Sequence, residues 1–192
     1  GGKEAVAFLR SLGDMLDQGM ADTRVTVKWD GAPAIICGVN PENGRFFVGT
    51  KSVFNKVNPK ISYSENDVDS MYPPGQLAEK LKDAYKYLST LSIPNVVQGD
   101  LLFTDDKYEA NIGGDTCIAF QPNTIVYAVP KDSDIGQKIE QAKFGIVFHT
   151  QYNGRTLDTM TASCGGINIQ GNTNVFVTSS DFKNASGEAN MT

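Results

Sequence analysis

The sequence predicts an α+β fold in which helices are inserted between the strands of mostly antiparallel sheets. Several stretches alternate apolar and polar residues, which is the period of a strand with one buried face. Others place apolar residues three and four apart, which is the period of an amphipathic helix. A chain of 192 residues with 40% hydrophobic and 20% charged residues can also bury a substantial core. These observations favour a single domain of the α+β class.

The N-terminal part is expected to contain one helix and a meander of three strands. Helical spacing of apolar residues predicts a helix over 4–18, and alternation then predicts a strand over 24–30. An apolar strand is expected over 34–39, followed by a turn at 40–44 and a third strand over 45–51. Short connections of this kind join antiparallel neighbours.

The middle of the chain is expected to run from a loop through a helix to a buried strand. Residues 55–73 are polar and interrupted by proline, which indicates a long surface loop. Pro74 opens a helix that extends to about Thr90, and an apolar strand follows over 95–103. The buried stripe of this helix is expected to comprise Leu77, Leu81, Ala84, Tyr85 and Leu88.

The remaining elements are shorter, and the composition changes near the end. Strands are expected over 116–120, 124–129 and 144–150, with a short helix over 132–142. Ser, Thr, Asn and Gly dominate after residue 160. We therefore expect the main domain to occupy residues 1–160. Residues 161–192 are expected to be a polar strand-and-loop extension of that domain, either complete or truncated.

Charge and cysteine content narrow the classes of function. Seventeen Lys and Arg against 22 Asp and Glu give a net charge of −5. This acidic balance argues against a protein that binds nucleic acid over its whole surface, but it does not exclude a local basic cleft. Three separated cysteines without C-x-x-C spacing argue against a disulfide scaffold or zinc ribbon and favour a reducing, cytoplasmic setting. No apolar run approaches the ~20 residues of a membrane span, so no membrane partner is expected.

The strongest local signal for chemistry is the segment Lys28-Trp29-Asp30-Gly31. Lys28 and Asp30 share one face of the expected strand at roughly 6.6 Å spacing, and Gly31 permits close backbone approach. A lysine that loses its proton through burial or neighbouring cations is a nucleophile. The alternative is that Lys28 and Asp30 form the solvent-facing side of an antiparallel strand.

This segment resembles the first motif, Lys-x-Asp-Gly, of the covalent nucleotidyltransferases, which include ATP-dependent DNA ligases, RNA ligases and mRNA capping enzymes. Further segments stand in the family's order over about residues 24–150. Val48–Ser52 is similar to a family motif in which a strand ends in a small and a basic residue. Val96–Leu102 is similar to another family motif, an apolar strand that contains a glycine followed by an acidic residue. The resemblance implies a ligase- or capping-type, ATP-grasp-like domain.

The resemblance also implies roles for individual residues. Lys28 would attack the α-phosphate of ATP or GTP, Asp30 and Gly31 would adjoin the nucleotide, and Lys51 would balance phosphate charge. Asp100 would bind Mg²⁺ or a ribose hydroxyl. Two further nucleotide contacts are implied, Tyr127 stacking on the base and Ile146 within the segment Gly145-Ile146-Val147.

The implied activity is that of an RNA or DNA ligase acting on the 5′-phosphate end of a nucleic acid, with ATP or GTP and Mg²⁺ as cofactors. The compact chain favours the RNA ligase type. Small divergent domains of this kind suggest a phage source, and hence the host cytoplasm. The sequence leaves open which nucleotide and which acceptor are used, and the oligomeric state.

Three departures from the family pattern leave other functions open. Phe144 stands where the family has a metal-binding Glu, Pro33 replaces a polar residue, and no Lys-x-Lys follows Gly145. Either the chain is truncated before the last motif, the site is rebuilt, or the protein binds nucleotide without turnover. The alternatives are thus a catalytically degenerate module that binds nucleotide or nucleic acid, or a phage structural domain of the same fold.

Other catalytic arrangements have less support in the sequence. His149 is the only histidine, on an expected strand where Phe148 takes the opposite face, and a lone histidine is more often a packed or hydrogen-bonded residue than a catalyst. The chain has no Gly-x-Ser-x-Gly elbow for a serine hydrolase. It also offers too few His and Cys ligands at useful spacing for a zinc site.

Overall fold

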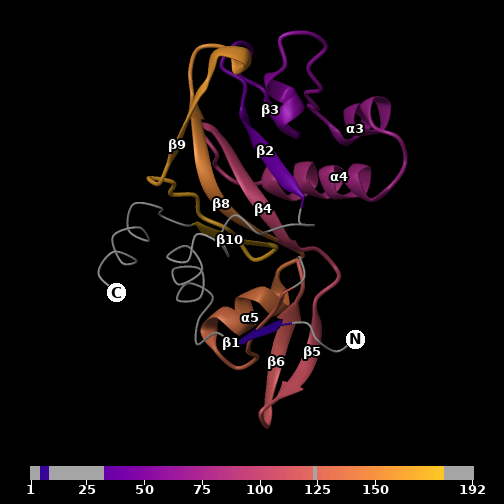
Figure 1. The fold of residues 1–192 in the computed structure, drawn as a ribbon, viewed down its shortest axis with the longest axis vertical. Helices are drawn as coiled ribbons and strands as arrows, with labels where there is room; N and C mark the ends of the chain where they lie inside the picture. The colour runs from indigo at the N-terminus through magenta and orange to yellow at the C-terminus, as the bar shows by residue number, and fades with distance from the viewer. Residues whose placement is uncertain (1–4, 9–32, 123–124, 180–192) are drawn as a thin grey trace.

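The computed structural model describes residues 5–8, 33–122 and 125–179. Two β-sheets lie one above the other along the longest axis of the molecule, with helices α3 and α4 beside the upper sheet and α5 beside the lower one (Figure 1). The described part is therefore an α+β fold with mostly antiparallel sheets, as the sequence predicts.

The larger sheet has six strands in the order β10-β8-β4-β2-β3, with β9 also pairing with β8. Its strands are β2 (Ala34–Val39), β3 (Phe46–Gly49), β4 (Val96–Phe103), β8 (Phe144–Asn153), β9 (Thr161–Cys164) and β10 (Val175–Ser179). All pairs are antiparallel except β10 with β8. Every residue of β4 is buried, because this central strand is covered on both faces.

The smaller sheet has four strands in the order β1-β7-β6-β5. They are β1 (Ala5–Phe8), β5 (Tyr108–Ile112), β6 (Asp115–Phe120) and β7 (Ile125–Pro130). β5 and β6 form a hairpin through Gly113 and Gly114, both of which have positive φ, a conformation that glycine adopts without steric cost.

Three α-helices and two short 3₁₀ helices complete the described elements. They are η1 (Lys51–Phe54), α3 (Glu65–Met71), α4 (Gln76–Leu88), α5 (Asp134–Gln141) and η2 (Leu157–Thr159). The side chains of Ser64 and Ser133 accept hydrogen bonds from backbone N–H groups in the first turns of α3 and α5, so both helices begin at a conventional N-cap.

Four apolar clusters lie among the described residues; one lies within the smaller sheet, and the other three pack the sheets against helices or against each other. The α4 core packs α4 on one face of the larger sheet and includes Leu81, Leu88, Leu101, Phe144 and Phe148. The η core covers part of the opposite face and includes Ile36, Phe47, Val53, Val96 and Leu157. The inter-sheet core joins the two sheets and α5, and includes Leu102, Phe103, Phe120, Tyr127 and Val147.

Two predictions about elements are wrong within the described residues. The expected helix over 4–18 is contradicted at Ala5–Phe8, which form β1 and pair with β7, so that strand pairing overrides the local helical pattern. The expected loop over 55–73 contains the helix α3, as well as a bridge between Ser62 and Val48. The expected strand over 24–30 lies outside the described residues.

The buried stripe predicted for α4 is wrong at one position. Leu81, Ala84 and Leu88 are buried as expected, whereas Leu77 is 42% exposed and Ala78 is buried in its place. No helix in the described ranges is long and apolar enough to cross a bilayer.

Candidate functional site

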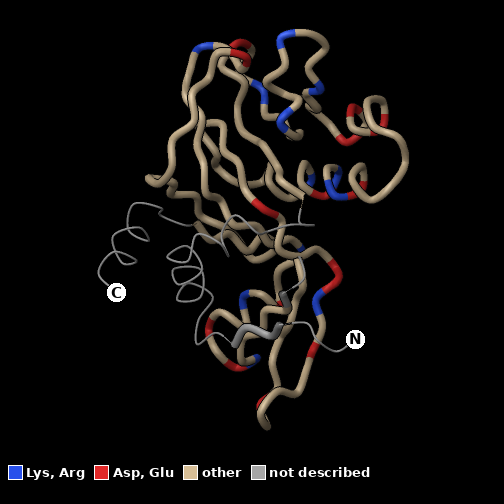
Figure 2. Tube along the Cα trace, in the orientation of Figure 1, with Lys and Arg blue, Asp and Glu red and all other residues tan. Residues whose placement is uncertain are grey.

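Polar side chains interrupt the apolar surface on the face of the larger sheet that lies opposite α4. Val96 of β4 belongs to the η core on this face, and Leu102 belongs to the inter-sheet core. Between them, Gln98 and Asp100 are both buried although the rest of the strand is apolar or glycine. Burying a carboxylate is costly unless partners compensate it, so this break requires an explanation. In Figure 2 a red acidic position stands on a central strand of the upper sheet, just above the junction with the lower one.

A β-bulge brings side chains of β8 to the same place. Gln98 pairs with Thr150 and Gly99 pairs with Phe148, so that His149 is an extra residue on β8. Such a bulge reverses the alternation beyond it. Phe148 therefore faces the α4 core, whereas His149 and Tyr152 both contact polar residues of β4 on the opposite face.

Each polar side chain of β4 has a partner on β8. The His149 Nε2 lies 3.4 Å from the Asp100 Oδ2, and the side chains of His149 and Asp100 are 18% and 12% exposed. His149 Nδ1 is 2.8 Å from the Thr150 Oγ1. The Tyr152 hydroxyl donates to the Gln98 Oε1 at 2.6 Å. We call these five residues the β4–β8 polar cluster.

The contacts leave two defined groups of the cluster for a ligand. Burial, followed by a smaller effect of Cys164, raises the pKa of the Tyr152 phenol, so its hydroxyl keeps the proton that it donates to Gln98. The Gln98 amide nitrogen then has no acceptor among the described residues, and the Asp100 Oδ1 has no described donor. The cluster therefore presents one amide donor and one carboxylate oxygen.

Two described parts of the chain next to predicted motifs lie near the strand that carries this cluster. The Pro33 carbonyl accepts a hydrogen bond of 3.1 Å from the Leu101 N–H, and Ala34 pairs directly with Asp100. Gly49, the last residue of β3, pairs with Ile36, which in turn pairs with Gln98. The start of β2 and the end of β3 thus lie at the same end of the sheet as Asp100.

The close packing of Gly49 explains why its position is occupied by glycine. A Cβ atom there would lie 2.4 Å from the Val53 Cγ1 and 3.1 Å from the Lys60 carbonyl oxygen. This packing turns the chain into η1, whose first residue is the exposed Lys51. Lys51 therefore leaves the sheet within two residues of the strand end that adjoins the cluster.

Two other predicted site residues lie away from the cluster. Ile146 pairs with Leu101 and is fully buried in the α4 core, on the face opposite Asp100. Tyr127 belongs to the smaller sheet and is buried in the inter-sheet core, with its ring 5.8 Å from that of Phe120. Lys28, Asp30 and Gly31 lie outside the described residues.

Phe144, which stands at the family's usual Glu position, is also part of the core. It is fully buried in the α4 core, with its ring 5.9 Å from that of Tyr87 on α4. A Cβ atom on the adjacent Gly145 would lie 2.3 Å from the Phe103 Cε2. Packing thus explains both residues within this segment.

Among the described residues, few side chains are available to bind a metal ion. No three His, Cys, Asp or Glu side chains come together in the parts of the chain that the structure describes. Mg²⁺ needs only one or two carboxylates when it also binds phosphate oxygens and water. The Asp100 carboxylate therefore suits a magnesium ion carried by a nucleotide better than a resident metal held by protein ligands alone.

The two buried cysteines offer no reactive thiolate. Burial raises the pKa of the Cys37 thiol far above its ordinary value, and burial also raises the pKa of Cys117. Both side chains are buried in the sheets, whereas Cys164 is exposed on β9.

Gln98 and Tyr152 were not predicted as site residues from the sequence. The signal for Gln98 is a polar residue two positions before Asp100 in an otherwise apolar strand. Nothing comparable marks Tyr152, because its position depends on the bulge at His149.

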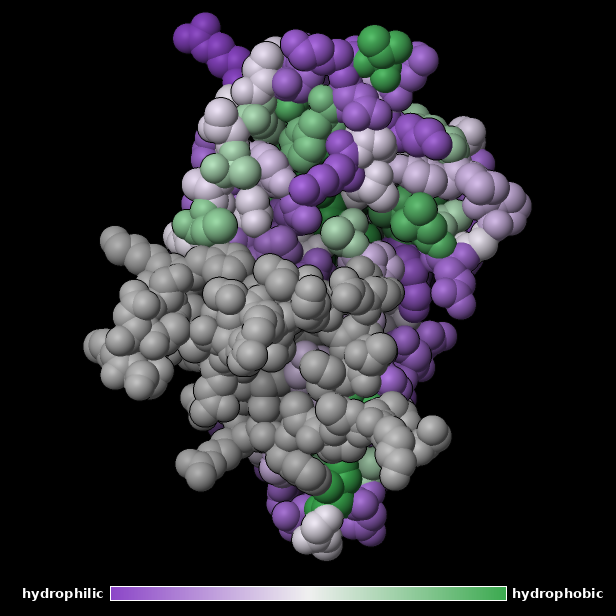
Figure 3. All heavy atoms as spheres, viewed as in Figure 1, coloured by the Kyte–Doolittle hydropathy of each residue, from purple (hydrophilic) through white to green (hydrophobic). Residues whose placement is uncertain are grey.

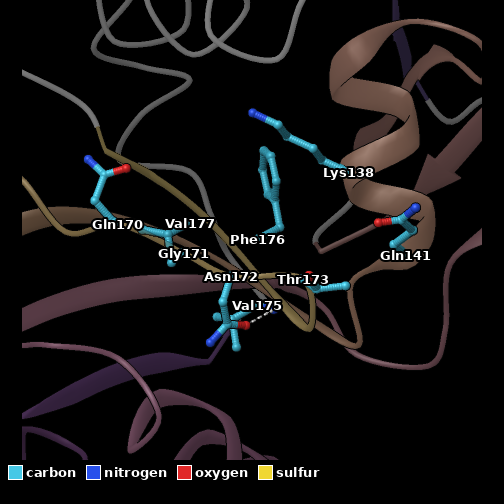
Figure 4. A pocket seen from close by; sticks show the side chains of 9 residues that line it. All are labelled: Lys138, Gln141, Gln170, Gly171, Asn172, Thr173, Val175, Phe176 and Val177. Carbon is cyan, nitrogen blue, oxygen red and sulfur yellow. Dashed lines mark hydrogen bonds between the residues drawn. The ribbon is translucent and has the colours of Figure 1, made fainter.

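A cavity of about 390 Å³ lies away from this cluster, between α5 and the turn that precedes β10 (Figure 4). Lys138 is the one charged residue among the described residues that line it. The Asn172 side chain accepts hydrogen bonds from the backbone N–H groups of Asn174 and Val175, and so serves the turn itself. None of the described residues that line the cavity is a carboxylate or a nucleophile that matches the predicted chemistry.

Comparison with known proteins places the chain in one family. Residues 1–192 match DUF6267, a family of unknown function, and the chain belongs to it. No curated protein and no solved structure matches the chain.

Proposed function

We propose that this protein is a Mg²⁺-dependent nucleotidyltransferase that forms a lysyl-nucleotide at Lys28 and uses it to activate the 5′-phosphate of a nucleic acid, as RNA and DNA ligases do. The observation that carries the proposal is the hydrogen bond between the Pro33 carbonyl and the Leu101 N–H. It holds Pro33, two positions after the Lys28-Trp29-Asp30-Gly31 motif, beside the part of β4 that carries Asp100, the acidic residue of a separate motif 72 positions after Lys28.

Covalent geometry limits how far Lys28 can be from this point. Pro33 is five positions after Lys28, and a fully extended segment of that length spans at most about 18 Å. The start of β2 pairs with Asp100, and the end of β3 pairs with β2. The backbone that follows the Lys28 motif, the end of β3 and Asp100 therefore lie at one end of the sheet, which supports the proposal of a shared site.

The proposed reaction consists of two displacements at the α-phosphorus. The neutral Lys28 amine attacks the α-phosphorus, a P–N bond forms, the bond to the bridging oxygen breaks, and pyrophosphate leaves while the amine loses a proton. A 5′-phosphate oxygen of the nucleic acid then attacks the same phosphorus and the P–N bond breaks. Catalysis of such transfers rests on in-line positioning and charge neutralisation.

The cluster supplies groups suited to these needs. Asp100 would bind the magnesium ion that accompanies the nucleotide, and that ion would neutralise charge on the phosphate oxygens. His149 would hold one carboxylate oxygen of Asp100 and leave the other for the ion. Lys51 would approach the phosphates from η1 as a cation.

The test is incubation with α-labelled ATP or GTP and Mg²⁺, followed by denaturing electrophoresis. We expect label on the native protein and none on Lys28→Ala. With Asp100→Asn we expect the rate of labelling to fall at least about tenfold, because stabilisation of the phosphate charge worth several kcal/mol is lost. Lys143→Ala, which removes an exposed lysine from the segment before β8, is the control and should label normally. Absence of label from the native protein with either nucleotide contradicts the proposal.

One observation favours a second function, a module that binds nucleotide without turnover. The position where the family carries a metal-binding Glu is occupied by Phe144, whose side chain packs against Tyr87 in the α4 core. A binding module would retain nucleotide in equilibrium dialysis but form no covalent label. A phage structural domain of the same fold would do neither.

A further inference from the structure

A stretch of the chain around η1 is basic although the protein as a whole is acidic. Residues 43–64 contain four of the 17 Lys and Arg, namely Arg45, Lys51, Lys56 and Lys60, and none of the 22 Asp and Glu. All four side chains are exposed. We call residues 43–64 the basic segment; in Figure 2 the loop that follows β3 carries blue positions with no red among them.

Within the described part of the chain, acidic side chains do not neutralise the cations of the basic segment. None of the four forms an ion pair with another described residue. The acidic helix α3 follows directly, but two of its carboxylates are engaged. Asp67 accepts from the Tyr63 N–H, and Asp69 pairs with Lys82. The positive charge of the segment is therefore available to an external anion.

Aromatic rings hold two of these cations in place. The Arg45 guanidinium lies 4.3 Å from the centre of the Tyr63 ring, and the Lys60 ammonium lies 4.9 Å from the centre of the Tyr72 ring. The Tyr63 hydroxyl in turn accepts from the side-chain amides of Asn40 and Asn43. Such contacts restrict long side chains and lower the entropy lost when they bind an anion.

One part of the basic segment lies near the candidate site. Lys51 follows the end of β3, which adjoins the β4–β8 polar cluster, and the chain returns to the sheet where Ser62 bridges to Val48. Cations thus extend from the cluster outward along the loop. An elongated anion with one end at the cluster would lie along them.

We infer that the basic segment binds the phosphate backbone of a single-stranded nucleic acid whose end lies at the β4–β8 polar cluster. Spaced lysines and arginines bind nucleic acid mainly through phosphates and release counterions when they do so. The inference rests on the proposed function for the role of the strand as acceptor, but strand binding itself requires no catalysis.

An anionic membrane fits the same surface less well. Val57 is 74% exposed and is the only large hydrophobic residue so exposed in the segment, whereas membrane-surface binding needs a continuous apolar face. On the face drawn in Figure 3 the coloured hydrophobic residues occupy separate small areas among hydrophilic ones.

The test measures binding of a fluorescein-labelled single-stranded RNA, and of the same sequence in DNA, by fluorescence anisotropy at several salt concentrations. If four phosphates are contacted, the slope of log K against log salt should be about −3. Arg45→Gln with Lys60→Gln should reduce the magnitude of the slope by about 1.4 and weaken binding about 25-fold at 0.1 M salt. Lys138→Gln with Lys143→Gln makes the same charge change near α5 and should leave binding nearly unchanged.

Three results would overturn the inference. These are absence of binding by the native chain, an equal loss in the two double variants, and binding of phosphatidylserine vesicles in place of nucleic acid. Covalent labelling without an acceptor separates this inference from the proposed function. The variant with Arg45→Gln and Lys60→Gln should label normally, and a chain that binds RNA but never labels would disprove the nucleotidyltransferase while the binding surface stands.

Discussion

One extra residue, His149, determines which side chains of β8 reach the candidate site. With strict alternation, Thr150 and Tyr152 would share the face of Phe148 and enter the α4 core. The bulge at His149, opposite Gln98 and Gly99, places them instead on the other face of the sheet, where the Tyr152 hydroxyl contacts Gln98 of β4. The sequence indicated that His149 and Phe148 take opposite faces, and the structure confirms this. It could not indicate the bulge, because a bulge depends on the register of two strands far apart in the chain.

At Gly145 packing alone excludes a side chain. A Cβ atom would lie 2.3 Å from the Phe103 Cε2, and Phe103 is itself fixed in the inter-sheet core. We expect Gly145→Ala to lower the free energy of unfolding by about 1–3 kcal/mol, which urea denaturation measures.

The effect of Gly145→Ala can be separated from a change in backbone entropy. In a Phe103→Leu background the added methyl group meets a smaller side chain, so the second substitution should cost less than it does in the native protein. A double-mutant cycle should give a favourable coupling energy of at least about 0.5 kcal/mol. Strict additivity of the two substitutions would show that the contact with Phe103 is not the cause.

Among the elements, α4 shows how helical periodicity predicts a core. Its apolar positions at spacings of three and four were expected to face the sheet, and Leu81 and Leu88 do so. The error at Leu77 follows from the width of the apolar stripe, because Leu77 and Ala78 are adjacent and only Ala78 fits against the sheet.

This difference between neighbouring turns of α4 gives a matched pair of substitutions. Leu81→Ala should lower the free energy of unfolding by about 2–5 kcal/mol, since it removes a fully buried side chain. Leu77→Ala makes the same chemical change at an exposed position and should cost less than about 1 kcal/mol. Similar losses in urea denaturation would mean that the helix does not pack on the sheet as described.

The missed elements α3, β5 and β1 lack a clear local signal in the sequence, each for a different physical reason. α3 is short and polar, and it begins at the Ser64 N-cap. A serine in a polar segment is equally common in loops, so the sequence does not distinguish this helix from a loop. β5 is largely exposed, so it lacks the alternation of a half-buried strand. β1 forms only by pairing with β7, 120 residues along the chain, and local spacing of apolar residues gives no information about such a partner.

At the level of the whole molecule, the order of motifs along the chain bears on which strands are neighbours. Asp100 and Lys51 were expected to share one site with the Lys28 motif; Asp100 lies on β4, Lys51 follows the end of β3, and β2 pairs with both strands. The Lys28 motif itself lies outside the described residues. Ile146 and Tyr127 were expected there by resemblance, but they occupy two different apolar cores. Order along the chain indicates which strands are neighbours, whereas the face that a side chain takes depends on register and bulges.

The central claim is that Lys28 carries a nucleotide in a site shared with Asp100. The most direct measurement is mass spectrometry of the protein after incubation with ATP or GTP and Mg²⁺, with digestion to locate the modified residue. The account predicts one nucleotidyl group on the peptide that contains Lys28, reduced in Asp100→Asn and released when pyrophosphate is added. An unmodified Lys28 peptide, or a nucleotidyl group on a different lysine, would contradict it.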